Sequence, residues 1–357
     1  MLTEAFINKI ATAVPPYDVH RRFIDFGRSL LVNDERRSAL FDRMVERAEI
    51  EHRFSYLSPT LEADRGGMPA TEFYTLPKFP TTGARMKLFE QQAPMLAEAA
   101  IAKLDLGEDR RRLTHILISC CTGFSAPGLD LEIMARCGLP GSMERSIIGF
   151  MGCYAAMNTL KLARHIVRSE PAARVLVLNL ELCSLHLKES ATLDEILSFL
   201  IFGDGCAASI VSSEPVGLAL DSFRAVLVPE TADLITWNIG DFGFDMVLSG
   251  QVPGAIQEAL RTGADEILAG APVSAIDLWA VHPGGRSVLD AVERAFDLRG
   301  TALSASRNIL RRFGNMSSAT VMFVLQSMLR ASAGTRGCAM SFGPGLIAET
   351  MLFHGTG

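Results

Sequence analysis

The feature that most constrains this chain is an internal repeat, in which three short segments recur in the same order and at one constant offset. Segment 115–123 (HILISCCTG) matches 277–285 (DLWAVHPGG), 149–157 (GFMGCYAAM) matches 311–319 (RRFGNMSSA), and 174–181 (RVLVLNLE) matches 336–343 (RGCAMSFG). Self-similarity at a fixed spacing indicates copies of one supersecondary unit. We therefore predict two similar halves, 1–214 and 215–357, divided within SSEPVG (212–217).

Each copy has the pattern of a β-α-β unit: an apolar strand, a glycine turn, a helix and a second apolar strand. Strands that are apolar throughout, without alternation, are typical of parallel sheets covered on both faces. In both helices the apolar residues fall on one face, as a core-facing helix requires. They are Ala156, Leu160, Ala163 and Val167 in the first helix, and Val321, Val324 and Met328 in the second. The pattern predicts a layered α/β fold.

Composition excludes several classes of protein. The 34 basic and 40 acidic side chains give a net charge of -6, which disfavours nucleic acid as a partner. Seven cysteines without CxxC spacing indicate neither a disulfide framework nor a thiolate zinc site, which favours a cytoplasmic protein. The first residues lack the features of a signal peptide. No run of 18 uncharged apolar residues occurs, so we expect no membrane span.

Reactive side chains stand at positions that the repeat makes equivalent. Cys153 and Asn315 are separated by the offset of the repeat, and so are Cys120 and His282. When two copies of one unit face each other, equivalent positions approach the pseudo-twofold axis. We therefore expect a thiol, an imidazole and a carboxamide to converge on one pocket.

Cys153 follows Gly152 at a predicted helix start, where backbone N–H groups and an imidazolium lower a thiol pKa by several units. The pattern predicts a thiolate nucleophile at Cys153. The alternative for any cysteine is a small buried hydrophobe, and we interpret Cys137, Cys206 and Cys338 in this way. His282 precedes Pro-Gly-Gly, which leaves its ring accessible. Asn315 is either an N-cap or an amide donor that forms an oxyanion hole with His282.

The strings GFMGCYAAM, VHPGG, FGNMSSA, LIFGDGCAA and SFGPGL, in this order, resemble the type III polyketide synthases, the chalcone-synthase-like branch of the thiolase fold. The resemblance runs from about Arg36 to Phe353. It implies a homodimer of five-layered αβαβα subunits that loads an acyl-CoA starter on cysteine and extends it with malonyl-CoA. It also implies that Cys153 is the nucleophile, that His282 and Asn315 complete the catalytic set, and that no metal or organic cofactor is needed.

The resemblance further implies residues that shape the cavity and bind coenzyme A. Phe202 in LIFGDG matches an aromatic gate, and SFGPGL matches a loop that shapes the cyclisation cavity through Gly343, Pro344 and Gly345. The cavity lining is expected to include Cys121, Thr122, Cys183 and His186. Arg43 and Arg47, at i and i+4 on one helical face, match an arm that binds the phosphates of coenzyme A.

Departures from the plant pattern bear on the product. Cys121, Cys183 and His186 stand where plant relatives carry hydroxyl side chains, and Ala126 replaces a methionine, as in bacterial members. These changes favour a medium or long fatty acyl-CoA starter and a pyrone or resorcinol product. A small-starter product of the phloroglucinol or tetrahydroxynaphthalene type is the alternative.

Three other classes of protein share parts of this pattern. A ketoacyl-carrier-protein synthase of the initiating type has the same order of Cys, His and Asn, but VHPGG and GNMSSA do not match its motifs. A papain-like hydrolase shares the order as well, but has no place for the internal repeat. A non-catalytic thiolase-fold protein would not need all three reactive side chains.

Overall fold

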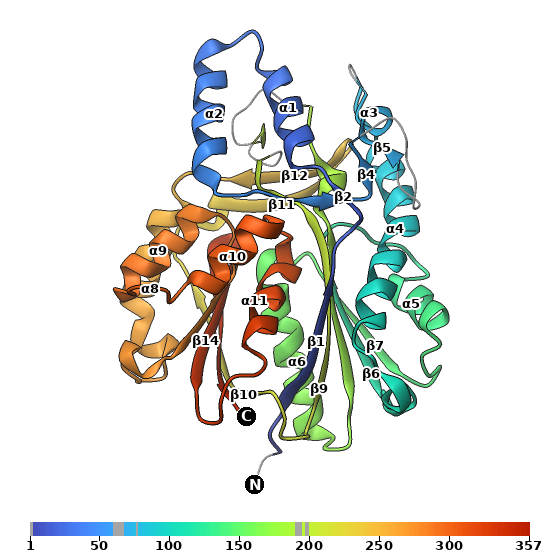
Figure 1. Ribbon diagram of the computed structural model, residues 1–357, viewed down its shortest axis with the longest axis vertical. Coiled ribbons are helices and arrows are strands. Elements are labelled where there is room, and N and C mark those ends of the chain that lie inside the picture. Colours follow the sequence, from blue (N-terminus) through green and yellow to red (C-terminus); the bar gives the residue numbers. More distant parts are fainter. Residues whose placement is uncertain (1–2, 60–67, 76–77, 190–194, 197–199) are drawn as a thin grey trace.

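The computed structural model describes residues 3–59, 68–75, 78–189, 195–196 and 200–357. Its main feature is a nine-stranded sheet in the order β13-β14-β15-β10-β1-β9-β8-β6-β7 (Figure 1). The strands are β1 (Phe6–Ala13), β6 (His115–Cys120), β7 (Glu144–Gly149), β8 (Val175–Leu182), β9 (Asp204–Ser212), β10 (Leu218–Leu227), β13 (Leu278–Val281), β14 (Arg336–Gly343) and β15 (Ile347–Gly355).

The pairing of these strands is the same on both sides of the sheet centre. β6 is parallel to β8, as β13 is to β14. β9 pairs antiparallel with β8 and β1, as β15 does with β14 and β10. β1 and β10 join the half-sheets through Phe6–Ala219 and Ile7–Leu218. This symmetry confirms the predicted α/β fold built from two similar halves; β7 is an additional edge strand.

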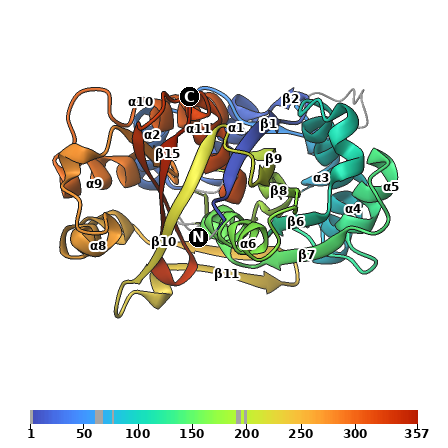
Figure 2. The ribbon, with the colours of Figure 1, turned by 90° about the horizontal axis from the view of Figure 1, so that it is seen from below.

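Helices complete a five-layered arrangement. α6 and α11 lie between the half-sheets, α4 and α5 cover one outer face, and α8 and α9 cover the other (Figures 1 and 2). The bounds are α4 (Thr82–Ala102), α5 (Leu129–Cys137), α6 (Ala155–Ser169), α8 (Val252–Ile267), α9 (Arg286–Phe296), α10 (Ser304–Phe313) and α11 (Thr320–Met328). The apolar faces predicted for α6 and α11 are buried in one central core. None of the described helices is long and apolar enough to cross a membrane.

The offset between the halves is not constant, which corrects one prediction. Gly152 (φ 68°) and Ser317 (φ 47°) are left-handed and each begins a 3-10 turn, η2 (Gly152–Tyr154) and η6 (Ser317–Ala319), that leads into α6 or α11. The separation of these two positions exceeds the offset of the sequence repeat by three. Cys153 therefore corresponds to Ser318, and the predicted equivalence of Cys153 with Asn315 is wrong by three positions.

The remaining elements gather over the end of the sheet where β6 and β13 finish (Figure 1). Segments that follow the carboxyl ends of parallel strands commonly form binding sites there. The elements are β2 (Tyr17–Asp18), α1 (His20–Leu30), α2 (Glu35–Ala48), β3 (Phe54–Ser55), β4 (Leu57–Ser58), β5 (Met68–Pro69), α3 (Ala70–Phe73), β11 (Ile235–Gly240) and β12 (Gly243–Leu248).

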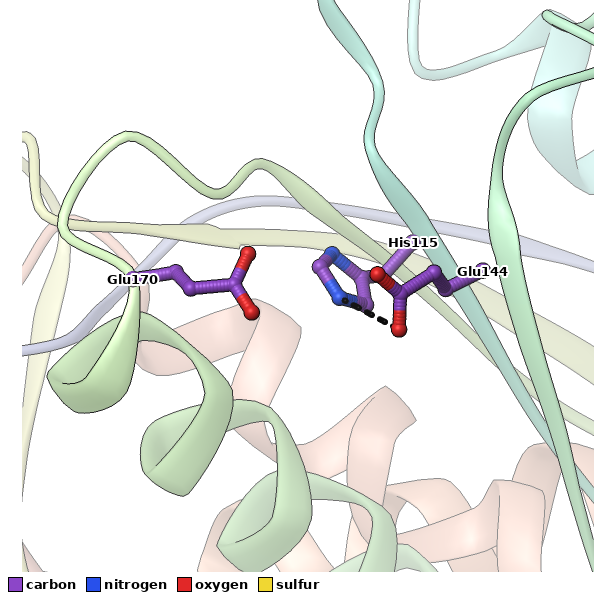
Figure 3. A group of neighbouring side chains, drawn as sticks. All are labelled: His115, Glu144 and Glu170. Carbon is purple, nitrogen blue, oxygen red and sulfur yellow. Dashed lines mark ion pairs between the residues drawn. The ribbon is translucent and has the colours of Figure 1, made fainter.

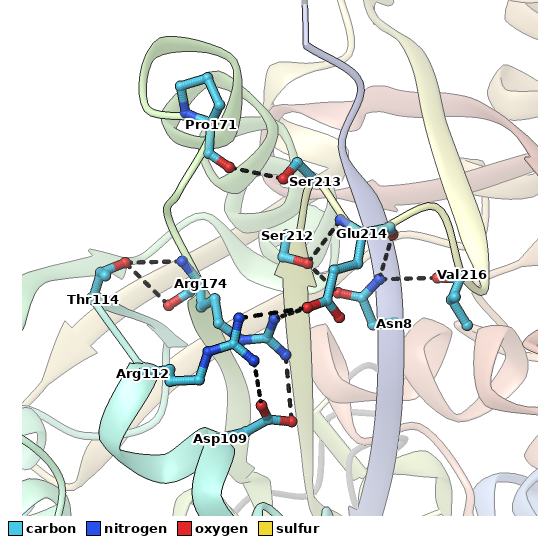
Figure 4. A network of polar contacts seen from close by, with 10 residues as sticks. All are labelled: Asn8, Asp109, Arg112, Thr114, Pro171, Arg174, Ser212, Ser213, Glu214 and Val216. Atoms are coloured by element: carbon cyan, nitrogen blue, oxygen red, sulfur yellow. Dashed lines mark hydrogen bonds and ion pairs between the residues drawn. The ribbon is translucent and has the colours of Figure 1, made fainter.

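Polar contacts tie the opposite end of the sheet together. The buried side chain of Arg174 pairs with Glu214 and, at 3.3 Å, with Asp109 (Figure 4). Nearby, His115 Nε2 lies 3.6 Å from Glu144 Oε2, and Glu170 approaches the ring from the end of α6 (Figure 3). These contacts link the end of α6 to the starts of β6 and β7.

Candidate active site

Cys153 lies in the tight turn between β7 and α6. Phe150 and Gly152 both have positive φ, 54° and 68°, so the chain reverses direction sharply just before the thiol. A Cβ on Gly152 would lie 2.2 Å from Cδ of Pro344 in the other half. Glycine is therefore required for the two halves to meet here. Of the seven cysteines, all within the described ranges, only Cys153 is partly exposed.

His282 follows β13 and continues its pairing, because its backbone N–H donates to the carbonyl of Met340 at 2.8 Å. The side chain is 1% exposed. Neither ring nitrogen has a hydrogen-bond partner among the described residues. Buried polar groups normally find partners, so an unpaired imidazole at a cavity wall points to a partner that arrives with the substrate.

Asn315 lies in the bend between α10 and η6 and is held by four hydrogen bonds. Its Oδ1 accepts from the backbone of Ser317 (2.8 Å), and its Nδ2 donates to the carbonyl of Gly284 (3.1 Å). Its backbone N–H donates to Ile201, and its carbonyl accepts from Gly203. Because the oxygen is engaged by a backbone donor, the carboxamide orientation is fixed, and its second N–H can donate to the Cys153 sulfur or to a ligand.

Burial of the site opposes the thiolate that the sequence predicted for Cys153. Burial raises the pKa of the Cys153 thiol to about 11, and hydrogen bonds from Ser317 and Asn315 offset this only in part. Burial lowers the pKa of His282 to about 3. Desolvation of both groups thus outweighs the helix-start effect predicted from the sequence. Both shifts favour a neutral thiol and a neutral imidazole in the resting site, in which case Cys153 needs a base that removes its proton.

Two cavities meet at Cys153. His282 and Asn315 border the outer one, which has a volume of about 790 Å³. The inner one leaves only about 40 Å³. Cys153, Phe202, Ile235 and Met246 border both cavities. The nucleophile therefore lies at the passage between the two spaces, and Phe202 is placed where a side chain can control that passage.

The structure brings most of the predicted lining residues to these cavities. Cys121, Thr122, Cys183, His186 and Pro344 border the inner cavity, and Gly343 and Arg47 border the outer one. Gly345 and Arg43 border neither of these two cavities. Gly345 (φ 74°) lies in the turn between β14 and β15. The outer cavity reaches α2 through Met44, Arg47 and Ala48.

His186 acts as a structural wall of the inner cavity. Its Nε2 lies 2.7 Å from the carbonyl of Thr122, and its Nδ1 accepts from the backbone N–H of Phe244 at 3.1 Å. The imidazole stacks on Phe244 at 4.1 Å between ring centroids and meets Trp237 edge to face. Burial lowers its pKa to about 3. The ring is neutral and fully engaged, so it shapes the cavity and leaves no free nitrogen for catalysis.

Glu181 is a site residue that the sequence reasoning missed. This fully buried carboxylate accepts from the backbone of Cys121 (3.0 Å) and from the hydroxyls of Thr122 (2.9 Å) and Ser318 (2.7 Å). Burial raises its pKa to about 7. It joins the two halves behind the inner cavity. The available signal was an acid within the run VLVLNLEL, which is apolar except for Asn179 and Glu181.

Comparisons with known proteins agree with this geometry. Residues 4–215 match the family model for the N-terminal domain of chalcone and stilbene synthases, and residues 219–357 match the model for the C-terminal domain. "Alpha-pyrone synthesis polyketide synthase-like Pks18" of Mycobacterium tuberculosis is 35% identical over 284 residues, which cover 75% of this chain and 72% of that protein.

Solved structures of similar proteins extend over the whole chain. PKS-I from the brown alga Ectocarpus siliculosus superposes with a TM-score of 0.89 at 28% identity, covering 99% of each chain. The C-terminal type III polyketide synthase domain of Steely1 from Dictyostelium superposes with a TM-score of 0.88, covering 99% of this chain and 100% of that domain. At 24% identity, the second likeness shows the fold alone.

Fold and site together define a condensing enzyme of the thiolase-like class, with a cysteine at the junction of two cavities. Within that class, the two family models and the 35% identical relative show that the chain belongs to the chalcone and stilbene synthase family and is a type III polyketide synthase. Enzymes of this family are acyltransferases that use acyl-CoA and malonyl-CoA.

Proposed function

We propose that Cys153 takes the acyl group of a starter acyl-CoA and that malonyl-CoA then extends it by decarboxylative condensation. The observation that carries the proposal is the position of Cys153 at the junction of the cavities, with His282 and Asn315 on the outer wall. His282 accepts the thiol proton as sulfur attacks the thioester, and coenzyme A leaves as the thiol. No metal or organic cofactor enters the proposal.

In the extension step, malonyl-CoA loses carbon dioxide and leaves an enolate. In this proposal the neutral imidazole of His282 and the second N–H of Asn315 donate hydrogen bonds to the enolate oxygen. The enolate carbon attacks the Cys153 thioester, the carbon–sulfur bond breaks, and the lengthened chain leaves on coenzyme A. Loss of carbon dioxide drives the formation of the carbon–carbon bond, so the protein has only to orient and stabilise the enolate.

Asn315→Ala is expected to slow malonyl-CoA decarboxylation by about 10²-fold, because removing one oxyanion donor has an effect of this size. Loading of Cys153, which does not pass through the enolate, should change much less. Carbon dioxide release and the mass of the acylated protein measure the two steps. Asn158→Ala, an asparagine of α6 that borders neither cavity, is the control. Undiminished decarboxylation would remove Asn315 from this role.

We propose that Arg47 and Arg286 bind the phosphates of coenzyme A at the mouth of the outer cavity. Both border that cavity. Arg286 is at the first turn of α9, within 3.3 Å of Glu49, and its side chain is 41% exposed. The sequence predicted Arg43 and Arg47 but not Arg286, because helical spacing alone cannot show which element faces α2.

Replacing Arg47 or Arg286 with alanine is expected to raise KM for acyl-CoA about tenfold, equivalent to ~1.4 kcal/mol, with little change in kcat. Arg43→Ala should leave KM unchanged. Steady-state kinetics with the N-acetylcysteamine thioester of the same acyl group provides a second control, since that substrate lacks the phosphates. An equal loss with both substrates would contradict phosphate binding.

For the product we propose a pyrone or resorcinol type made from a medium or long fatty acyl-CoA, supported by the relative named for alpha-pyrone synthesis. The small inner cavity, about 40 Å³, favours the second candidate, a small starter giving a phloroglucinol or tetrahydroxynaphthalene product. Mass spectrometry of products from a panel of acyl-CoA starters from two to sixteen carbons decides between them. Turnover of short starters alone would exclude the fatty acyl proposal.

We also propose a homodimer. β7 is an unpaired edge of the nine-stranded sheet, and exposed strand edges invite pairing. Large apolar side chains are exposed on this strand, Ile147 at 43%, and in the loop between β6 and α5, Phe124 at 38%. Sedimentation of the purified protein tests the proposal, and a monomer at micromolar concentration would contradict it.

A further inference from the structure

Arg53 is a completely buried arginine next to the active site that the proposed reaction does not use. Its exposed fraction is 0%. The guanidinium donates through Nε to Nδ1 of His20 (3.0 Å) and through Nη2 to the carbonyl of the same residue (3.3 Å). Its Nη1 donates to the carbonyl of Phe202 at 3.2 Å. Arg53 therefore connects the start of α1 to the residue at the passage between the cavities.

The aliphatic part of Arg53 packs against two glycines adjoining the site. A Cβ on Gly203 would lie 3.3 Å from Arg53 Cβ, and a Cβ on Gly314 would lie 2.8 Å from Arg53 Cγ. Gly314 also has a φ of 67°, which favours glycine. These glycines follow Phe202 and precede Asn315. The side chain thus fills the space between the segments that carry the gate and the catalytic amide.

The same two segments are hydrogen-bonded to each other. Asn315 donates from its backbone to Ile201 at 2.8 Å, and Gly203 donates to the carbonyl of Asn315 at 3.0 Å. The result is an isolated parallel bridge that pairs Phe202 with Asn315. Arg53 contacts both sides of this bridge, with its stem on the glycines and its Nη1 on Phe202.

We propose that Arg53 is a positioning residue that holds Phe202 and Asn315 as one unit, so that the amide meets the enolate only when the gate is in place. The proposal rests on the roles given above to Phe202 and Asn315. According to this proposal, Arg53 affects the extension step although it borders neither cavity, and it has little effect on starter loading.

The surroundings of Arg53 fit this role better than a purely structural one. Burial lowers its pKa to about 9, so it stays charged at neutral pH. No carboxylate among the described residues lies within ion-pair distance of the guanidinium, and Asp18 accepts from its backbone N–H instead. A buried cation without a paired anion is costly, and an apolar side chain of this size would often be more stable. What the cation gains is three directed hydrogen bonds, one of them to the gate.

The test compares two steps in Arg53→Met, which keeps an unbranched stem and removes every donor. Acylation of Cys153 is followed by intact-protein mass spectrometry, and malonyl-CoA decarboxylation by carbon dioxide release. Decarboxylation is expected to fall about 10²-fold, the cost of small misplacement at a reacting centre, while acylation changes less than about threefold. Arg53→Lys, which keeps the charge but loses the fork, should lie between.

The matched control is Arg174→Met. Arg174 is also a buried arginine, 7% exposed, but holds Asp109 and Glu214 at the opposite end of the sheet (Figure 4). Its variant should lower both steps by the same factor. An unchanged ratio of the two steps in Arg53→Met, or in Arg53→Lys if the first variant does not fold by near-ultraviolet circular dichroism, would overturn the proposal. Absence of decarboxylation in the unmodified enzyme would instead contradict the proposed function.

Discussion

Replacing Cys153 with alanine is expected to abolish polyketide formation, with a fall of at least about 10⁴-fold, the usual size for loss of a nucleophile. The covalent route needs a thiol that faces the outer cavity, where His282 and Asn315 lie. Among the seven cysteines only Cys153 borders that cavity. Product is measured by mass spectrometry after incubation with acyl-CoA and malonyl-CoA, and the intact protein should carry no acyl adduct.

The control for this experiment is Cys183→Ala. Cys183 borders the inner cavity and not the outer one that His282 and Asn315 border, and burial raises its pKa well above the ordinary value. We therefore do not expect it to compete as a nucleophile. Its variant should retain a full acyl adduct, although a wider inner cavity can change the product. An acyl adduct and product formation in Cys153→Ala would show that another residue carries the chain.

The sequence was sufficient to predict the fold and to single out Cys153, His282 and Asn315, which the structure places around one cavity, because both depend on local patterns. Apolar strands, glycine turns and one-sided helices recur in both halves, and the structure repeats the strand pairing on each side of β1 and β10. The motifs around Cys153, His282 and Asn315 are short and contiguous. The repeat predicted that these residues converge, although in the structure Cys153 corresponds to Ser318, three positions after Asn315.

What could not be predicted depends on contacts between distant segments. The sign of the pKa change at Cys153 is set by burial, which a helix-start motif does not reveal. Glu181 and Arg53 act through partners far away in the sequence, as in the bonds from Thr122 to Glu181 and from Arg53 to Phe202. Which arginines border the outer cavity depends on how α9 lies relative to α2. Such features follow from tertiary packing and leave little trace in a single sequence.

The second large effect is expected for His282→Gln, and it should appear as a change in pH dependence. With a pKa of about 11, the Cys153 thiol alone is ionised to only about 10⁻⁴ at pH 7. When His282 removes the proton during attack, loading should be nearly independent of pH between 5 and 9, since an imidazole with a pKa of about 3 stays neutral there. Without it, loading should fall by about 10³-fold at pH 7.

The sign of the dependence is what separates the two mechanisms. A raised thiol pKa means that the thiolate fraction grows tenfold for each unit of pH below 11, so loading of His282→Gln should rise tenfold per unit and approach the unmodified enzyme near pH 10. His186→Gln is the matched control, because His186 is also buried but is already bonded to Thr122 and Phe244. The pH profile of this variant should stay flat.

Alkylation of Cys153 by iodoacetamide gives the same measurement without substrate, and the six other, buried cysteines should react more slowly. If His282→Gln loads starter at pH 7 as fast as the unmodified enzyme, the thiol does not depend on this base, and the burial that raises its pKa must be relieved when substrate binds.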